Sequence, residues 1–402
     1  MAGCATIGAR EREMEIPPAT LSGFLAGKPA PLHDLYAVLL RQGPRNAVLN
    51  QMRVGLAATD LGATDAATEA LDQALAGVET VYAQSETAAK ARQLWYRESY
   101  KDFKGEPYER AMAYYYRGLL YLREGDFENA RASFKGGMLQ DAFAQDAQNR
   151  ADFALLAFLE GWASHCLGDQ ALARQSFDEA KTLKPALSLP ALDHNVLLLA
   201  ETGTAPVKVG DGPRHSLLRY RRGSGFSEAS VRFRVGDTAR PAFHVEDIYW
   251  QASTRGGRPV DYILEGKVAF KDDLSTAGNV MTTVGLATVV AGAANRSSEA
   301  TIAGAAVTML GLIAQGVSGA VKPEADVRAW DNLPDGVHVL TAALPAGPPR
   351  VEAVFFDTAG APVRGMTRPV PIQFAKRCGI GWVRSRSAVP ANPRAPGTVP
   401  GG

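Results

Sequence analysis

Small and large apolar residues recur at fixed spacing three times in the first half of the chain. A glycine is followed by a glycine after seven residues, an alanine after five, a large apolar residue after four and a small residue after three. This order predicts three helical hairpins, because glycine ends a helix in a left-handed cap and small residues let two helices cross closely. The copies are Gly55, Gly62, Ala67, Leu71 and Ala74; Gly118, Gly125, Ala130, Phe134 and Gly137; and Gly161, Gly168, Ala173, Phe177 and Ala180, with Pro185 after the last.

This spacing resembles that of the tetratricopeptide repeat (TPR), which implies a TPR-like helical repeat domain over residues 31–200. Successive copies lie 63 and 43 residues apart, against about 34 for the standard repeat. We therefore expect an irregular array of hairpins and no regular superhelix. An ordinary helical bundle is the competing interpretation.

Aromatic and charged residues gather before and within the second copy. Trp95, Tyr108, Arg110 and Tyr115 are of the types that most often anchor protein partners. We predict that they line a groove that binds a protein. The alternative is that these rings pack between irregular helices.

The composition changes after Pro190. Residues 204–214 are rich in glycine, proline and charge, which predicts a linker over 201–214. Alternating apolar and polar runs in 215–271 and 336–384 predict strands, and hence a β-rich module over 215–385. The tail 386–402 has many prolines and few apolar residues, so we expect it to be disordered. The predicted fold class is α+β, with several domains.

A Gly/Ala-rich segment over 274–321 has charged side chains only near its centre. It predicts a hairpin of two helices whose close approach is set by Gly285, Gly292, Gly304 and Gly311. We expect the hairpin to be covered by protein, because the amides of Asn279 and Gln315 would lack partners in hydrocarbon. The alternatives are a membrane-inserted hairpin and a pore component.

The chain opens with Met1-Ala2-Gly3-Cys4, which fits the end of a bacterial lipoprotein signal. This predicts a lipid on Cys4, a start codon further upstream and a polar, helix-poor tether over residues 1–30. Ala5 after the cysteine favours the outer membrane, facing the periplasm, by resemblance to Gram-negative lipoproteins. A chance cysteine near a cytoplasmic N-terminus is the alternative.

Charge and cysteine content exclude several classes of protein. The chain has 43 Lys and Arg against 42 Asp and Glu, whereas nucleic-acid binders carry a basic domain or stripe. Without a Cys/His cluster, no structural zinc site is expected. Cys166 and Cys378 are left either as a disulfide pair or as two unrelated buried thiols, and the latter is the commoner case.

The sequence also lacks the familiar motifs of metalloproteases, serine hydrolases and nucleotide-binding enzymes. His244, Glu246 and Asp247 lie close together, with Asp261 on a neighbouring predicted strand, and could support acid–base chemistry. Such residues are more often exposed polar groups of a strand. We therefore expect no enzyme, no cofactor and no metal, and we keep a hydrolase-like envelope enzyme as the alternative.

Three segments together resemble an uncharacterised family of bacterial TPR-bearing lipoproteins: 105–116, 266–271 and 323–334. The resemblance covers roughly 40–385 and implies a Gly/Ala-rich hydrophobic stretch, a C-terminal β module and an envelope location. It brings no catalytic residues with it. The resulting hypothesis is a membrane-tethered scaffold for proteins of the cell envelope, with no nucleic acid and no evident small-molecule substrate among its ligands.

Overall fold

Helices form the first half of the chain and strands most of the second, which confirms the α+β class. The computed structural model describes residues 13–83, 102–142, 152–211, 217–255, 326–345, 347 and 350–390. Its helices are α1 (Pro18–Leu25), α2 (His33–Gln42), α3 (Ala47–Asp60), α4 (Thr64–Ala83), α6 (Pro107–Glu124), α7 (Phe127–Ala142), α8 (Ala154–Leu167), α9 (Gln170–Leu183) and α10 (Ile248–Arg255), with short 3-10 turns at Ala30–Leu32 and Pro44–Asn46.

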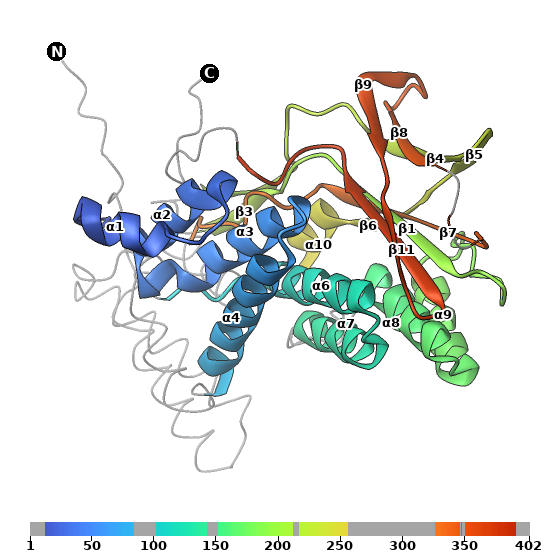
Figure 1. Ribbon diagram of the computed structural model, residues 1–402, viewed down its shortest axis with the longest axis horizontal. Helices are drawn as coiled ribbons and strands as arrows, with labels where there is room; N and C mark the ends of the chain where they lie inside the picture. Colours follow the sequence, from blue (N-terminus) through green and yellow to red (C-terminus); the bar gives the residue numbers. More distant parts are fainter. Residues whose placement is uncertain are drawn as a thin grey trace, which may run out of the picture.

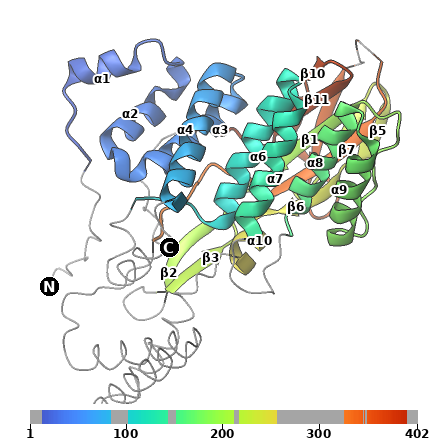
Figure 2. The same cartoon turned by 90° about the horizontal axis from the view of Figure 1, so that it is seen from below.

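Helices α3 and α4, α6 and α7, and α8 and α9 pack as successive hairpins, which follow one another in a row with strands along one side (Figure 1 and Figure 2). Glycine ends the first helix of each hairpin: Gly62, Gly125 and Gly168 have φ angles of +72°, +73° and +90°. These left-handed values favour glycine, because a Cβ atom would be strained there.

The first glycine of each copy lies where the two helices of its hairpin cross. A Cβ atom at Gly55 would lie 2.7 Å from Leu71, one at Gly161 would lie 2.5 Å from Phe177, and one at Gly118 would overlap the ring of Phe134. At Gly137 it would lie 2.9 Å from Leu156. Buried positions of the copies are Ala67, Leu71, Ala74, Ala130, Phe134, Ala173, Phe177 and Ala180. Pro185 is exposed just after α9 ends.

The strands of the described residues form three sheets. The five-stranded sheet has the order β10-β11-β1-β7-β6, and only β1 and β11 pair in parallel among its strands. The four-stranded sheet has the order β5-β4-β8-β9, and β2 and β3 form a ribbon. The strands are β1 (Val196–Thr202), β2 (Val207–Asp211), β3 (Leu217–Arg221), β4 (Ser230–Val235), β5 (Thr238–Pro241), β6 (Phe243–Asp247), β7 (Gly336–Ala342), β8 (Val351–Phe356), β9 (Pro362–Pro369), β10 (Ile372–Ala375) and β11 (Cys378–Arg384).

The five-stranded sheet is buried on both faces. Leu197 and Leu199 of β1 belong to the main core, which also contains the helical hairpins. Val196 and Leu198 point the other way, into a smaller core shared with the four-stranded sheet. The order of layers is therefore helices, five-stranded sheet and four-stranded sheet, which follows from the alternation of side chains along each strand.

The predicted boundary between a helical domain ending at 200 and a linker over 201–214 is wrong. It cuts through β1, the central strand of the five-stranded sheet, and the expected linker contains β2 as well. The continuous apolar run of β1 has no alternating pattern, because both faces of this strand are covered. The helices and the sheet share one core and do not form separate modules.

Both predicted flexible ends have structure in their described parts. Helix α1 lies within the expected tether, where Pro17 precedes its first turn. At the other end, Ala388 is buried and its N–H donates a 2.8 Å hydrogen bond to Asp60 Oδ2 in the helical half. Arg386 pairs with the buried carboxylate of Glu228 at 2.7 Å. The start of the predicted disordered tail is therefore fixed by contacts that composition alone does not reveal.

Several predicted features lie outside the described residues. They are Cys4, Trp95, Asp261 and the hairpin 274–321 with Gly285, Gly292, Gly304 and Gly311.

Candidate functional site

The predicted partner-binding residues on α6 are buried inside the protein. Tyr108, Arg110 and Tyr115 are 1%, 5% and 0% exposed. Arg110 donates hydrogen bonds to Gln140 Oε1 at 2.9 Å and to the carbonyl oxygen of Gly105 at 2.7 Å. These side chains cannot serve as accessible anchors, so this part of the sequence prediction is wrong. The rings pack within the molecule, as the alternative interpretation held.

A buried carboxylate lies where α6 meets the five-stranded sheet. Glu201, near the end of β1, accepts hydrogen bonds from Tyr115 Oη at 3.1 Å and Tyr116 Oη at 3.0 Å. From the sheet side, Trp382 Nε1 donates at 2.9 Å and Arg384 Nη1 at 2.6 Å. Burial raises the pKa of Glu201, and the charge of Arg384 opposes that rise. Four donors around one carboxylate fix the helix against the sheet and satisfy the buried charge.

A second buried carboxylate, Glu109 on α6, receives another part of the chain. Its Oε2 accepts from Lys208 Nζ at 2.7 Å and from the N–H of Glu106 at 2.7 Å. Its Oε1 accepts from the N–H of Trp330 at 2.8 Å. Lys208 belongs to the β2–β3 ribbon, so one carboxylate joins a helix, the ribbon and the segment that leads into β7.

That segment, residues 326–335, is here named the strap. It has no helix or strand, and its Trp330 side chain is completely buried. Arg53 of α3 donates to the strap carbonyl of Ala329 at 3.1 Å and to Asp331 Oδ1 at 2.8 Å. Arg328 in turn donates to Asn46 Oδ1 at 2.7 Å. Side chains of α3, of α6 and of the short turn before α3 thus hold a peptide of the same chain that has no helix or strand.

The strap and the five-stranded sheet of the same chain therefore cover the face of the helical row that contains Tyr108 and Tyr115. We call this the inner face. This is the face on which the sequence placed a partner. The occupied face explains why the aromatic residues of α6 are buried.

The candidate acid–base residues divide between the two faces of the five-stranded sheet. His244 lies opposite His338, whereas Glu246 lies opposite Val337 because the register shifts between them. Neighbouring residues of β7 point to opposite faces, so the side chains of His244 and Glu246 do too. The carboxylate of Glu246 accepts instead from the N–H of Leu155 at 3.2 Å and from Gln251 Nε2 at 3.0 Å.

Burial changes the pKa values in this region. It raises the pKa of the wholly buried Glu246 to about 8. It lowers the pKa of His338 to about 3, with the nearby His244 adding to the effect. Asp335, whose pKa is raised by burial to about 6, pairs with Arg222, which also binds Asp247. Glu246 can therefore stay protonated in the neutral range, as a group that stabilises the start of α8 and not as a partner of His244.

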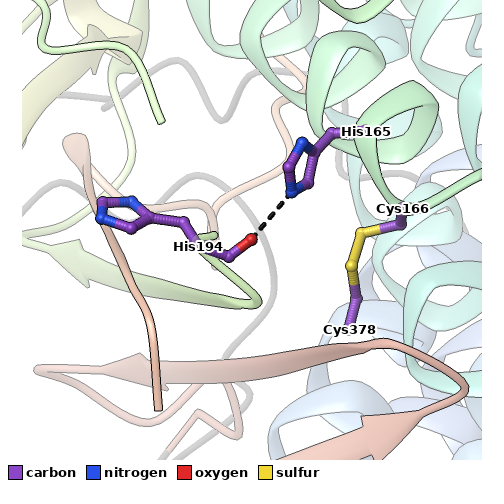
Figure 3. Close-up of a disulfide and its surroundings, with 4 residues drawn as sticks. All are labelled: His165, Cys166, His194 and Cys378. Atoms are coloured by element: carbon purple, nitrogen blue, oxygen red, sulfur yellow. Dashed lines mark hydrogen bonds between the residues drawn. A yellow bond between two sulfur atoms is a disulfide. The ribbon is translucent and has the colours of Figure 1, made fainter. Parts of the chain in front are cut away.

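A disulfide joins the helical row to the sheet. Cys166 of α8 and Cys378 of β11 are bonded, with their Cα atoms 5.9 Å apart (Figure 3). Beside it, His165 Nε2 donates to the carbonyl oxygen of His194 at 2.8 Å, in the segment that leads into β1. The interpretation of the two cysteines as unrelated thiols is therefore wrong. Their 212-residue separation gave no indication of contact.

The described residues offer few other features of a ligand site. Among them, no three His, Cys, Asp or Glu side chains gather in a way that could hold a metal ion. A hollow of about 330 Å³ lies between α1 and α2, away from the predicted site residues. Within the described part of the chain, no helix has both the length and the apolar character needed to cross a membrane.

Comparisons with protein-family models, curated proteins and solved structures each found no match for this chain.

Sequence reasoning missed the buried carboxylates, of which Glu201 is the clearest case. The available signal was a single acid directly after the apolar run of Val196–Ala200. A charge that interrupts such a run either ends the strand at the surface or is buried with partners. The sequence does not choose between these, because the partners lie about 85 and 180 residues away.

Proposed function

We propose that this protein is an exported lipoprotein of the cell envelope, tethered through Cys4, that acts as a binding scaffold and not as an enzyme. The observation that carries the proposal is the disulfide between Cys166 and Cys378. Disulfides persist in the periplasm and other oxidising compartments and are rare in the cytosol of most bacteria. The pairing leaves Cys4 as the remaining cysteine of the chain, within the lipoprotein-like sequence Ala2-Gly3-Cys4.

The hairpins provide the second element of the proposal. Their spacing supports a TPR-like origin, because in each copy the second glycine forms the cap and the first glycine lies against the large apolar residue at the crossing. Such repeats usually bind a partner on their inner face, but here that face is covered by other parts of the same chain. We infer that the helical row serves as a rigid support for the sheets, and that the outer face of the four-stranded sheet remains available for binding.

The non-enzymatic part of the proposal rests on the geometry around His244. One predicted partner, the carboxylate of Glu246, is on the other face of the sheet and accepts hydrogen bonds from Leu155 and Gln251. The other, Asp247, is near enough for its charge to act on the pKa of His244, but it is paired with Arg222. The hydrogen bonds of Glu201 and Glu109 join separate elements of the fold and satisfy two buried carboxylates. These contacts favour structural roles for the buried acids.

Mass spectrometry of the protein isolated from its native membranes tests this proposal. We expect an acylated Cys4 at the mature N-terminus and, after digestion without reductant, one peptide pair linked through Cys166 and Cys378. A protein with free thiols at both positions and an unmodified N-terminus would refute an envelope location. Acylation without the disulfide would remove the observation on which the proposal rests.

A further inference from the structure

The outer face of the four-stranded sheet carries a cluster of arginines. Val231 and Phe233 of β4 are buried in the core between the two sheets. Arg232 and Arg234 alternate with them along the strand and are exposed on the opposite face. Arg350, next to the neighbouring strand β8, has a side chain that is 79% exposed. We name Arg232, Arg234 and Arg350 the arginine face.

The charge of this face is only partly compensated. Glu352 lies opposite Arg234 in the register of β4 and β8, and it forms ion pairs with Arg234 and Arg350. Its side chain is only 13% exposed. The two arginines lower the pKa of Glu352, so it remains ionised. With three guanidinium groups against one covered carboxylate, the arginine face presents a net positive charge.

Apolar groups lie among these charges. Arg232 stacks over the ring of Phe356, with its guanidinium carbon 4.7 Å from the ring centroid. Phe356 and Val354 alternate with the buried residues of β8 and are partly buried on the outer face. Stacking restrains the Arg232 side chain and leaves the edge of its guanidinium group available for hydrogen bonds.

We propose that the arginine face binds the phosphate headgroups of an anionic lipid surface. A guanidinium group binds phosphate through two parallel hydrogen bonds, and three such groups on a sheet suit an extended surface better than a single small anion. The partly buried Phe356 and Val354 beside them present apolar atoms that suit the boundary between headgroups and acyl chains. The proposal goes beyond the proposed function, and it requires no lipid anchor to be tested.

Co-sedimentation with vesicles provides the test, with a chain that carries Cys4→Ala so that no lipid is attached. We expect it to bind vesicles containing phosphatidylglycerol and phosphatidylcholine, and to bind vesicles of phosphatidylcholine alone much more weakly. Each arginine near an anionic surface strengthens binding about fivefold. The variant R232Q/R234Q/R350Q should therefore bind on the order of a hundredfold more weakly. Added salt should weaken wild-type binding in the same direction.

A matched control removes three positive charges from exposed positions on the outer helices: K135Q/R174Q/K181Q. This variant should bind within about twofold of the wild-type chain, because these residues lie on α7 and α9, away from the arginine face. Equal weakening by both triple variants would overturn the proposal in favour of net charge alone. Equal binding to both kinds of vesicle would overturn it too, and would point to an acidic protein or to apolar insertion. These results do not depend on acylation of Cys4, so the proposed envelope location can fail or stand independently.

Discussion

The packing of the hairpins can be tested where α6 crosses α7, by adding a single methyl group at Gly118. In the structure, three ring atoms of Phe134 lie 2.8 Å or less from the position that a Cβ atom of residue 118 would occupy. Ordinary contacts between carbon atoms are about 3.5–4.0 Å. The substitution Gly118→Ala must therefore move a completely buried ring or separate the two helices.

The expected magnitude is the difference of two opposing effects. Overpacking of a well-packed core costs about 1–3 kcal/mol. Alanine gains about 1 kcal/mol over glycine in a helix interior. Because Phe134 lies in the main core with little room to move, we place the clash at the upper end of its range. The free energy of unfolding should fall by about 1–2 kcal/mol.

Urea denaturation of four proteins measures this effect: the wild type, Gly118→Ala, Phe134→Leu and the double variant. A smaller side chain at 134 makes room for the new methyl group, so the double variant should lose less stability than the sum of the single losses. Gly23→Ala is the matched control, since Gly23 lies in α1 and a Cβ atom there would meet nothing within 4 Å. That control should be neutral or more stable. The packing argument fails if Gly118→Ala behaves like Gly23→Ala, or if Phe134→Leu gives no rescue.

Two further predictions concern buried carboxylates. Glu201→Ala should lower the free energy of unfolding by about 3–5 kcal/mol, because it leaves the buried Arg384 without its charge partner. The control Glu69→Gln, which breaks the surface pair with Lys28, should lower it by at most about 1 kcal/mol. Equal losses for the two variants in urea titrations would contradict the prediction. Glu246 has a pKa of about 8 in the folded state against an ordinary 4.5, so between these pH values the folded state holds a proton that the unfolded state releases. The free energy of unfolding should therefore fall as pH rises from 4.5 to 8, by up to about 1.4 kcal/mol per pH unit. His338 has the opposite effect, because its pKa of about 3 makes stability fall as pH decreases below 6.5. The difference in free energy of unfolding between the wild type and Glu246→Gln, measured across pH, isolates the contribution of Glu246. A difference that does not change with pH would refute the assignment.

The helical hairpins were predictable because their determinants are local. Gly118, Gly125 and Phe134 lie within seventeen residues, and the cap and the crossing that they form involve one another. The same locality explains the correct expectation of strands in β4, where Arg and apolar residues alternate. Neither pattern required knowledge of the rest of the chain.

The proposed partner groove failed for a reason that local patterns cannot express. Tyrosine and arginine are favoured both at binding surfaces and in satisfied polar cores, so their presence on α6 did not show which role they take. The outcome depended on Glu201, which Tyr115 reaches across 86 positions of sequence. Likewise, Trp330 could be recognised as part of a distinctive segment, but its place against Glu109 is set by a contact across 221 positions.

The position of β1 explains why the helices and strands do not separate into modules. Its strand neighbours, β7 and β11, come from the far end of the chain, and β11 is covalently bonded to α8. Placing β1 between them brings Glu201 beneath α6, where two tyrosines of the helix and two side chains of the sheet share its carboxylate. Removing the sheet would leave these tyrosines and the apolar inner face of the helices in water, at a cost of about 25 cal/mol for each Å² of apolar surface. The face of the helices that a repeat protein would offer to a partner is therefore part of this protein's own core.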